Sequence, residues 1–188
     1  MKTIIELTGM PASGKSTLAA MLEKKGIKVV RMGDAVRREM LEKGMKLNNV
    51  TLRKYVVSVR RKFGNNYILN LVKKDVDVAL KTSDMVVLDG PRNISEAEYF
   101  RKRGYSVFII GVVADRLQRY ERILKRHNST DMTSLKEFEW REKQELKLGT
   151  SEILAFSDFF IHNNGSETDL GVKMDEVFRK IGTFGPKS

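Results

Sequence analysis

Short apolar runs recur along the chain, and longer stretches with a helical spacing of apolar positions separate them. The runs are rich in β-branched and aromatic residues and do not alternate strictly with polar ones, which indicates strands covered on both faces of a sheet. The predicted strands are residues 4–7, 29–30, 85–88, 107–112 and 159–161. The predicted helices are residues 15–25, 34–43, 51–81, 95–103 and 115–126, with N-caps at Asp34, Ser95 and Asp115. This alternation predicts an α/β fold, a three-layer αβα sandwich around a parallel sheet.

The alternation is interrupted once, between the second and third predicted strands. Residues 34–81 are helical in pattern throughout, which is far longer than a simple crossover between parallel strands requires. We therefore expect a helical insertion there. A polar loop over residues 126–133 separates two further helical segments, and residues 115–148 are expected to carry a lid. With 188 residues, the chain is expected to form a single domain, residues 1–188.

The composition narrows the possible partners and chemistry. Lys and Arg number 35 against 24 Asp and Glu, a net charge of +11. This excess suits an acidic partner such as nucleic acid, anionic lipid or phosphorylated metabolites, and solubility alone is the other explanation. The absence of cysteine excludes disulfides, thiolate zinc sites and a cysteine nucleophile. The longest uncharged apolar run, residues 106–114, is too short for a membrane helix and no signal peptide is evident, so we expect a cytoplasmic protein without membrane partners.

One glycine-rich motif indicates phosphate binding. The segment GMPASGKS at residues 9–16 matches G-x-x-x-x-G-K-[ST] and stands between a predicted strand and a predicted helix, as this motif requires. Its glycines let successive N–H groups point inward around an anion, and the helix N-terminus adds positive potential. Lys15 is expected to reach the β- and γ-phosphates of ATP, and the Ser16 hydroxyl to bind Mg²⁺. The predicted ATP-binding residues here are Gly9, Met10, Pro11, Ala12, Ser13, Gly14, Lys15, Ser16 and Thr17.

The third predicted strand ends in an acidic residue, Asp89. Ligands of open α/β sheets lie beyond the carboxyl ends of the strands, so Asp89 is expected beside the phosphate-binding loop. A carboxylate there can hold Mg²⁺ through water, because this ion keeps much of its hydration shell. The alternative is an ordinary turn aspartate before Gly90 and Pro91.

Two further segments resemble the adenylate kinase branch of the P-loop nucleoside-monophosphate kinases. GDAVR at residues 33–37 is similar to the Gly-Asp-x-x-Arg segment of that branch, and DGPR at residues 89–92 to its Asp-Gly-x-Pro-Arg segment, one residue shorter. The resemblance implies that Arg37 and Arg92 bind the phosphate of an acceptor nucleotide. It also implies five parallel strands in the order 2-3-1-4-5 and an acceptor-binding role for the insertion. The residues expected at the acceptor site are Gly33, Asp34, Arg37, Arg60, Asp89, Gly90 and Arg92.

The C-terminal half is more similar to dephospho-CoA kinase. Residues 157–166 resemble the segment of that family near the adenine of ATP, which implies that Asn163 and Gly165 bind the nucleotide. Arg141 resembles an arginine that follows the lid of such kinases. The chain as a whole resembles an archaeal-type family of adenylate-kinase-related proteins.

Basic residues cluster in two of the predicted helical segments. Arg119, Arg122 and Arg126 fall on one face of their helix, apart from its apolar stripe. Because phosphoryl transfer depends on converging cations, we expect these arginines, with Lys15 and Arg141, to be catalytic. A solvated basic face is the alternative.

The insertion carries its own basic residues, and three interpretations of them remain open. They are Arg53, Lys54, Arg60, Arg61 and Lys62. They fit an acceptor-binding flap, an ordinary exposed charge run, or an RNA contact in which Tyr55, Phe63 and Tyr67 stack on bases. Elsewhere, Phe138 and Trp140 stand at helical spacing and are expected to be packing residues.

These observations favour an enzyme, an ATP- and Mg²⁺-dependent kinase. It would transfer the γ-phosphoryl group of ATP to a nucleoside monophosphate, with AMP favoured, or to a related phosphorylated small molecule. An AMP- or ATP-binding sensor with weak or no turnover is the first alternative, motivated by Met32 and the shortened turn at Pro91. A nucleic-acid-linked ATPase, motivated by the net charge, is the second. The sequence does not decide the oligomeric state.

Overall fold

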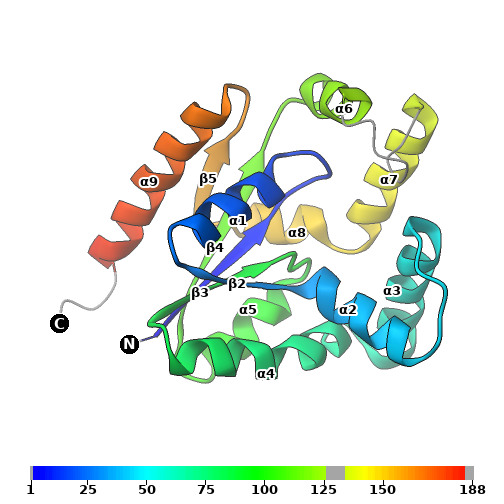
Figure 1. Ribbon diagram of the computed structural model, residues 1–188, viewed down its shortest axis with the longest axis horizontal. Coiled ribbons are helices and arrows are strands. Elements are labelled where there is room, and N and C mark those ends of the chain that lie inside the picture. Colours follow the sequence, from blue (N-terminus) through cyan, green and yellow to red (C-terminus); the bar gives the residue numbers. More distant parts are fainter. Residues whose placement is uncertain (1, 126–133, 185–188) are drawn as a thin grey trace.

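The computed structural model describes residues 2–125 and 134–184, and its strands form one parallel sheet (Figure 1). The strands are β1 (Thr3–Thr8), β2 (Lys28–Arg31), β3 (Met85–Asp89), β4 (Ser106–Val113) and β5 (Phe159–His162). Their order in the sheet is β2-β3-β1-β4-β5, and every neighbouring pair is parallel. In the central strand, Ile5 pairs with Val87 of β3 and Phe108 of β4. The predicted five-stranded sheet and its strand order are confirmed.

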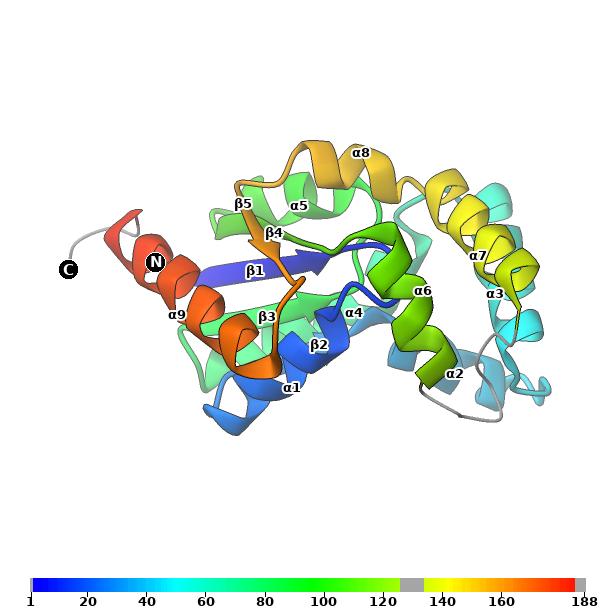
Figure 2. The ribbon, with the colours of Figure 1, turned by 90° about the horizontal axis from the view of Figure 1, so that it is seen from above.

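Helices cover both faces of this sheet, as Figure 2 shows from above. The helices are α1 (Lys15–Lys24), α2 (Met32–Glu42), α3 (Asn49–Phe63), α4 (Tyr67–Lys81), α5 (Ile94–Arg101), α6 (Arg116–Lys125), α7 (Leu135–Lys147), α8 (Thr150–Ala155) and α9 (Glu167–Phe184). Ile5 of β1 is buried in a cluster with Leu18 of α1 and Met174 of α9. Its neighbour Ile4 is buried on the opposite face, in a cluster to which α4, α5 and α8 contribute. The predicted three-layer αβα sandwich is confirmed.

The helical insertion is present, but residues 51–81 do not form the single helical stretch that the pattern suggested. α3 ends at Phe63, and α4 begins at Tyr67. Gly64 between them has a φ of 88°, a conformation that glycine adopts without steric cost and that takes the chain out of the helix. The break lets α3 and α4 lie at an angle, with α3 toward the carboxyl edge of the sheet (Figure 1).

Two of the three predicted N-caps are wrong. α2 begins at Met32 directly after β2, with Arg31 as its extended cap residue, so Asp34 lies inside the first turn. α5 begins at Ile94, because Asn93 forms a capping box with Glu96, so Ser95 also lies inside the helix. The third N-cap position is confirmed, because Asp115 directly precedes α6 and its carbonyl accepts a hydrogen bond from the Arg119 N–H.

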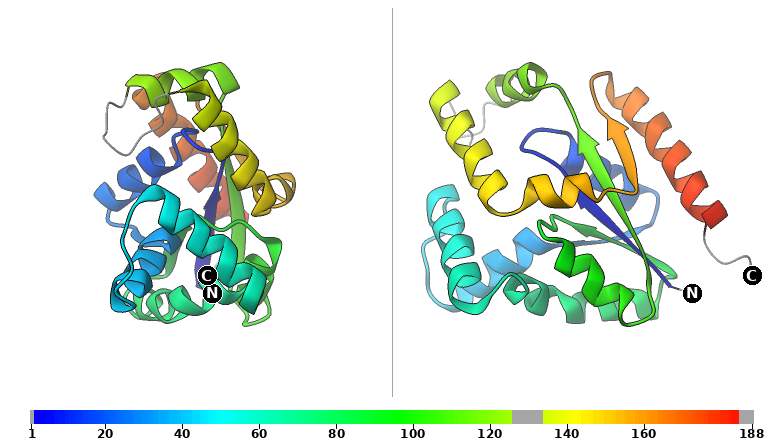
Figure 3. Two further views of the ribbon diagram at one scale, coloured as in Figure 1. Left: turned by 90° about the vertical axis from the view of Figure 1, so that its right-hand side faces the viewer. Right: turned by 180° about the vertical axis from the view of Figure 1, so that it is seen from behind.

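Helices α6 and α7 lie beyond the carboxyl edge of the sheet, and α7 runs beside α3 (Figure 3). They pack on one another through Ile123 and Phe138, and Ala12 of the β1–α1 loop contacts this small core. The predicted polar loop at residues 126–133 lies outside the described residues. Among the residues described, no helix is both long and apolar enough to cross a bilayer.

Candidate functional site

The loop between β1 and α1 forms a small pocket at the carboxyl edge of the sheet. Residues 9–16 line this pocket of about 140 Å³, together with Arg92, Arg141 and Glu145. Ala12 has a positive φ of 61°, and Gly14 has a φ of 98° immediately before the first residue of α1. Alternating left- and right-handed conformations gather backbone N–H groups into a concave anion site, here at a helix N-terminus.

Side chains from distant elements hold the carbonyl groups of this loop. Arg119 donates to the Pro11 carbonyl (3.3 Å), and Arg122 donates to the Ala12 carbonyl (3.4 Å). Asn163, directly after β5, donates its amide to the Ser13 carbonyl at 2.8 Å. Because the C=O and N–H of one peptide point in opposite directions, these bonds direct the next N–H groups away from the anchoring side chains. Predicted lid arginines therefore contact the loop itself, while Arg126 lies outside the described residues.

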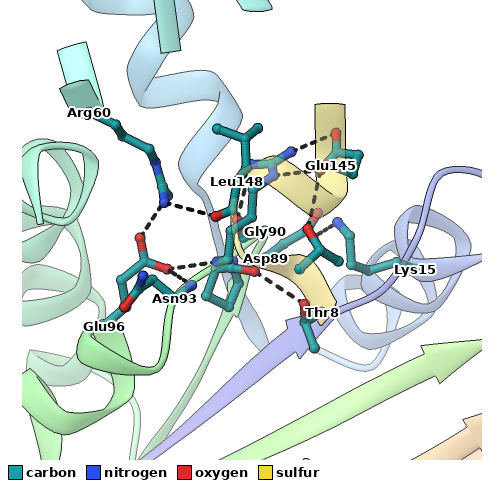
Figure 4. Close-up of polar contacts among 12 residues, drawn as sticks. Thr8, Lys15, Arg60, Asp89, Gly90, Asn93, Glu96, Glu145 and Leu148 are labelled. Atoms are coloured by element: carbon teal, nitrogen blue, oxygen red, sulfur yellow. Dashed lines mark hydrogen bonds and ion pairs between the residues drawn. The ribbon is translucent and has the colours of Figure 1, made fainter. Parts of the chain in front are cut away.

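Lys15, which lines the pocket, forms an ion pair with Asp89 (Figure 4). Asp89 is buried at the end of β3, and its neighbour in the sheet is Leu7, near the end of β1. The parallel pairing of β1 and β3 thus brings the acidic side chain to the loop, as the sequence predicted. A phosphate arriving here would compete with Asp89 for the Lys15 ammonium group.

A second pocket of about 160 Å³ adjoins the first. Its apolar lining comes from α2, α3, α4 and the residue after α7, and its charged lining is mainly arginine. The lining residues are Met32, Gly33, Val36, Arg37, Leu52, Arg53, Val56, Ile68, Arg92, Arg141, Glu145 and Leu148. Arg92, Arg141 and Glu145 line both pockets, so the two cavities meet at these side chains.

Positive charge is concentrated where the pockets meet. Burial and the neighbouring Arg141 lower the pKa of the Arg53 guanidinium to about 10. Arg92 is held by Glu145 through two hydrogen bonds, at 2.7 and 3.3 Å. Burial opposes ionisation of Glu145, but Arg92 lowers its pKa overall. The lowered pKa of Arg53 shows that its positive charge is disfavoured beside Arg141, and an anion bound here would relieve this cost.

The turn that carries Arg92 is fixed by buried polar contacts (Figure 4). Thr8 of β1 donates its hydroxyl to the Pro91 carbonyl at 3.2 Å. The backbone N–H groups of Arg92 and Asn93 donate to Glu96 at 2.7 and 3.1 Å. Arg60 donates to the other carboxylate oxygen of Glu96 at 2.9 Å. The predicted acceptor-site residue Arg60 does not line the second pocket, and it supports the Arg92 turn instead.

The remaining predicted residues divide between the pockets and their surroundings. Gly33 and Arg37 line the second pocket. Asp34 is exposed and forms an ion pair with Arg37 at 2.5 Å, and Gly90 accepts a hydrogen bond from Arg92 at 3.3 Å. Thr17 and Gly165 line neither pocket. Phe138 is fully buried as predicted, whereas Trp140 is 45% exposed and is not a core residue.

Sequence reasoning missed Glu145 and did not single out Arg53. Arg53 was grouped with other basic residues of the insertion, and only the packing of α3 against the core singles it out. Glu145 belongs to no motif, and its significance comes from its contact with Arg92, 53 residues away in the chain.

The oxygen donors present fit a magnesium ion bound together with phosphates. Ser16 lines the first pocket and supplies a hydroxyl group, and Asp89 supplies a carboxylate beside it. No group of three or more His, Cys, Asp and Glu side chains suited to a metal occurs among the described residues. The ion would take its other ligands from phosphate oxygens and water, which is the usual environment of Mg²⁺.

Comparisons with known proteins identify the family. A family model described as AAA domain matches residues 5–146. A UPF0200 protein of Thermococcus kodakarensis is 34% identical over 184 residues, which cover 95% of this chain and 100% of the relative. The chain therefore belongs to the AAA domain and UPF0200 families. The glycine-rich loop of this UPF0200 family member, residues 9–16, lies within the matched region.

Solved structures share the fold of the UPF0200 chain. The crystal structure of TT1252 from Thermus thermophilus has a TM-score of 0.70 at 23% identity, covering 95% of this chain and 97% of that one. Dephospho-CoA kinase from Campylobacter jejuni has a TM-score of 0.60 at 18% identity, covering 96% and 98%. The resemblance to P-loop kinases is thus confirmed at the level of fold.

Proposed function

We propose that this protein is an ATP-dependent kinase that transfers the γ-phosphoryl group of Mg-ATP to a small acceptor bearing a phosphate group, with AMP favoured. One observation carries the proposal. The phosphate-binding pocket opens onto a second, arginine-lined pocket, and Arg92 and Arg141 belong to both. A kinase needs a donor and an acceptor site that meet at the transferred group.

The donor would be held at the first pocket. Backbone N–H groups of residues 9–16 and the Lys15 ammonium group would bind the triphosphate, and Ser16 and Asp89 would hold Mg²⁺. When bound, the ion neutralises phosphate charge and orients the γ-phosphoryl group. Arg119, Arg122 and Asn163 keep the loop in its binding conformation by holding its carbonyls.

The acceptor would occupy the second pocket. Its apolar lining suits a base, and Arg37, Arg53 and Arg92 suit a phosphate. An oxygen of that phosphate forms the new bond to the γ-phosphorus, and the bond from this phosphorus to the bridging oxygen of ADP breaks. Arg141, at the meeting point, would stabilise the charge on the moving group. Phosphoryl transfer asks the protein mainly for such positioning and charge neutralisation.

The test is product formation from Mg-ATP and a panel of acceptors. ADP and a phosphorylated product should appear with at least one nucleoside monophosphate or with dephospho-CoA. Lys15→Ala should abolish the reaction, and Arg92→Ala should raise the KM of the acceptor far more than that of ATP. Exposed Arg103 follows α5 and lines neither pocket, so Arg103→Ala offers a matched control. Absence of transfer to every acceptor would refute the kinase assignment.

A nucleotide sensor is the second candidate, favoured by Met32. This side chain is buried and lines the acceptor pocket, where the adenylate kinases resembled here usually carry a small hydroxyl residue nearby. Calorimetry separates the two functions, since a sensor binds AMP and ATP tightly without turnover.

A further inference from the structure

A groove of about 560 Å³ lies between α3 and α7, on the side of α3 away from the sheet. The two helices run side by side at one end of the molecule (Figure 3). The groove is lined by Arg53, Lys54, Val57, Ser58, Arg61, Lys62, Trp140 and Gln144. Of its lining residues only Arg53 also lines the second pocket, so the groove adjoins the proposed acceptor site at that side chain and is otherwise separate from both pockets.

The spacing of residues along α3 creates this surface. Tyr55, Val56 and Val59 are buried toward the core. Lys54, Val57 and Arg61 stand three and four residues apart, so they form a separate stripe that faces outward. On α7, Trp140 and Gln144 are likewise four residues apart and face the same groove.

The cations of the groove differ from the other basic residues described above. Arg37, Arg92 and Arg119 each pair with a carboxylate. In contrast, no carboxylate among the described residues forms an ion pair with any of four groove cations, which are Arg53, Lys54, Arg61 and Lys62. Within the part of the chain that the structure describes, no acidic side chain lines the groove either. The surface is therefore complementary to a ligand with several negative charges.

The groove also offers an aromatic surface. Trp140 is 45% exposed, and the Arg53 guanidinium lies 5.4 Å from the centre of its ring. The aromatic residues that the sequence grouped with these cations are less suitable. Tyr55 is buried, and Phe63 stacks on Tyr67 with 5.0 Å between ring centres. Trp140, expected to be a packing residue, takes their place.

We propose that the groove between α3 and α7 binds a single-stranded nucleic acid segment, with a base stacked on Trp140 and backbone phosphates on Arg53, Lys54, Arg61 and Lys62. Unpaired cations beside an exposed aromatic ring are the arrangement by which proteins bind single strands without reading their sequence. The net charge of +11 would add long-range attraction. The site is separate from the phosphate-binding loop and shares only Arg53 with the proposed acceptor pocket, so variants of the other groove residues test it independently of the kinase activity.

Trp140 supplies the probe, because it is the only tryptophan in the chain. Titration with an oligonucleotide such as oligo(U) or oligo(dT) should quench its fluorescence. The logarithm of the association constant should fall with the logarithm of salt concentration with a slope of about −3, as expected for roughly four phosphates neutralised on a single strand. Comparing the titrations with RNA and with DNA shows whether the 2′-hydroxyl group contributes to the affinity. Quenching by AMP alone as strong as that by the oligonucleotide would overturn the proposal, as would no quenching at all.

Two double variants with the same net charge separate the groove from general attraction. Lys54→Glu/Lys62→Glu changes two groove lysines, and Lys74→Glu/Lys81→Glu changes two exposed lysines of α4. Measured by anisotropy of a labelled oligonucleotide, the groove variant should bind at least tenfold more weakly, with a salt slope shallower by about 1.4. Equal losses in both variants would show attraction without a site and overturn the proposal.

A tryptophan pair tests the stacking, with the same labelled oligonucleotide. Trp140→Ala should weaken binding about tenfold, and Trp140→Phe should restore much of the affinity, because any aromatic face can stack on a base. The ATP-induced rise in melting temperature should survive in all four variants, which shows that they fold. Unchanged binding by Trp140→Ala would exclude the groove as the site.

Discussion

At the scale of single residues, the most unusual side chain is Glu6 in the central strand. It is fully buried, and neither carboxylate oxygen has a hydrogen-bond partner among the described residues. Burial, reinforced by the nearby Glu96, raises the pKa of Glu6 well above its usual value. A buried charge here would be costly, so the protonated carboxyl is the favoured form in the folded protein.

This burial predicts how stability depends on pH. The folded state binds this proton more tightly than the unfolded state, so stability falls as pH rises above about 4.5, the ordinary value for glutamate. Glu6→Gln keeps the shape without the titrating proton. It should raise the free energy of unfolding near neutral pH by about 1 kcal/mol or more and flatten the pH dependence. Urea unfolding across the pH range checks this, with exposed Glu98→Gln as the control. A wild-type stability that rises with pH while the Glu6→Gln curve rises in parallel would contradict the argument.

Gly14 is the second residue whose local geometry makes a prediction. A Cβ added there would lie 1.9 Å from the Asn163 amide nitrogen, and its φ of 98° disfavours any other residue. Gly14→Ala should destabilise the fold by about 1–3 kcal/mol and weaken ATP binding at least tenfold, since the loop must shift. In Gly171→Ala, by contrast, the new methyl group meets nothing within 4 Å in the middle of α9. That control should be neutral or stabilising by about 0.5–1 kcal/mol. Normal ATP affinity in Gly14→Ala would show that the loop is not the binding site.

At the scale of elements, most strands and helices of the fold could be predicted from the local sequence. The strands and the glycine-rich loop were predictable because their signals are short-range, an apolar run or a motif between strand and helix. The errors occurred where neighbouring residues compete for one role. Asn93 takes the cap position that Ser95 was assigned, and Gly64 ends a helix whose apolar pattern continues beyond it.

The candidate site was predictable only where a motif marks it. The loop and Asp89 are adjacent because β1 and β3 pair, which parallel topology implies. The contacts of Arg119 and Arg122 with the loop join residues more than a hundred positions apart. Helical spacing identified the stripe that these arginines share, but not the surface that it would meet.

The anchoring of the loop by α6 leads to a third prediction. The planar guanidinium of Arg122 donates to two carbonyls, those of Ala12 (3.4 Å) and Asn163 (2.6 Å). The ammonium group of a lysine has no such planar arrangement of donors and cannot reproduce both bonds. Arg122→Lys should therefore raise the KM for ATP about tenfold, with little change in stability. Arg116 lies on the same helix but pairs with Glu139 and Glu142, so Arg116→Lys is the control. Steady-state kinetics or calorimetry decides, and equal effects of both substitutions would argue against a specific anchor.

At the scale of the whole molecule, α7 joins the parts that surround the two pockets. Its Glu142 accepts from Arg119 (2.6 Å), which holds the loop, and its Glu145 accepts from Arg92, which lies on the turn after β3. The outer face of the same helix lines the groove with Trp140. Ligand binding at the pockets is thus expected to be felt across the fold.

The last prediction concerns the stability of the whole fold with and without nucleotide. Mg-ATP at about a hundred times its dissociation constant should add about 2.7 kcal/mol to the free energy of unfolding. For a chain of 188 residues this corresponds to a rise in Tm of about 5–10 °C. Lys15→Ala leaves Asp89 buried without its cation and should melt earlier on its own, so the comparison is the shift that ATP produces within each variant. That shift should nearly vanish in Lys15→Ala and persist in Arg37→Ala, whose side chain lines only the second pocket.

Adenosine, which lacks the phosphates, should produce a far smaller shift in the wild-type protein. If adenosine and ATP stabilise equally, the base rather than the phosphates provides the affinity, and the loop at residues 9–16 loses its assigned role.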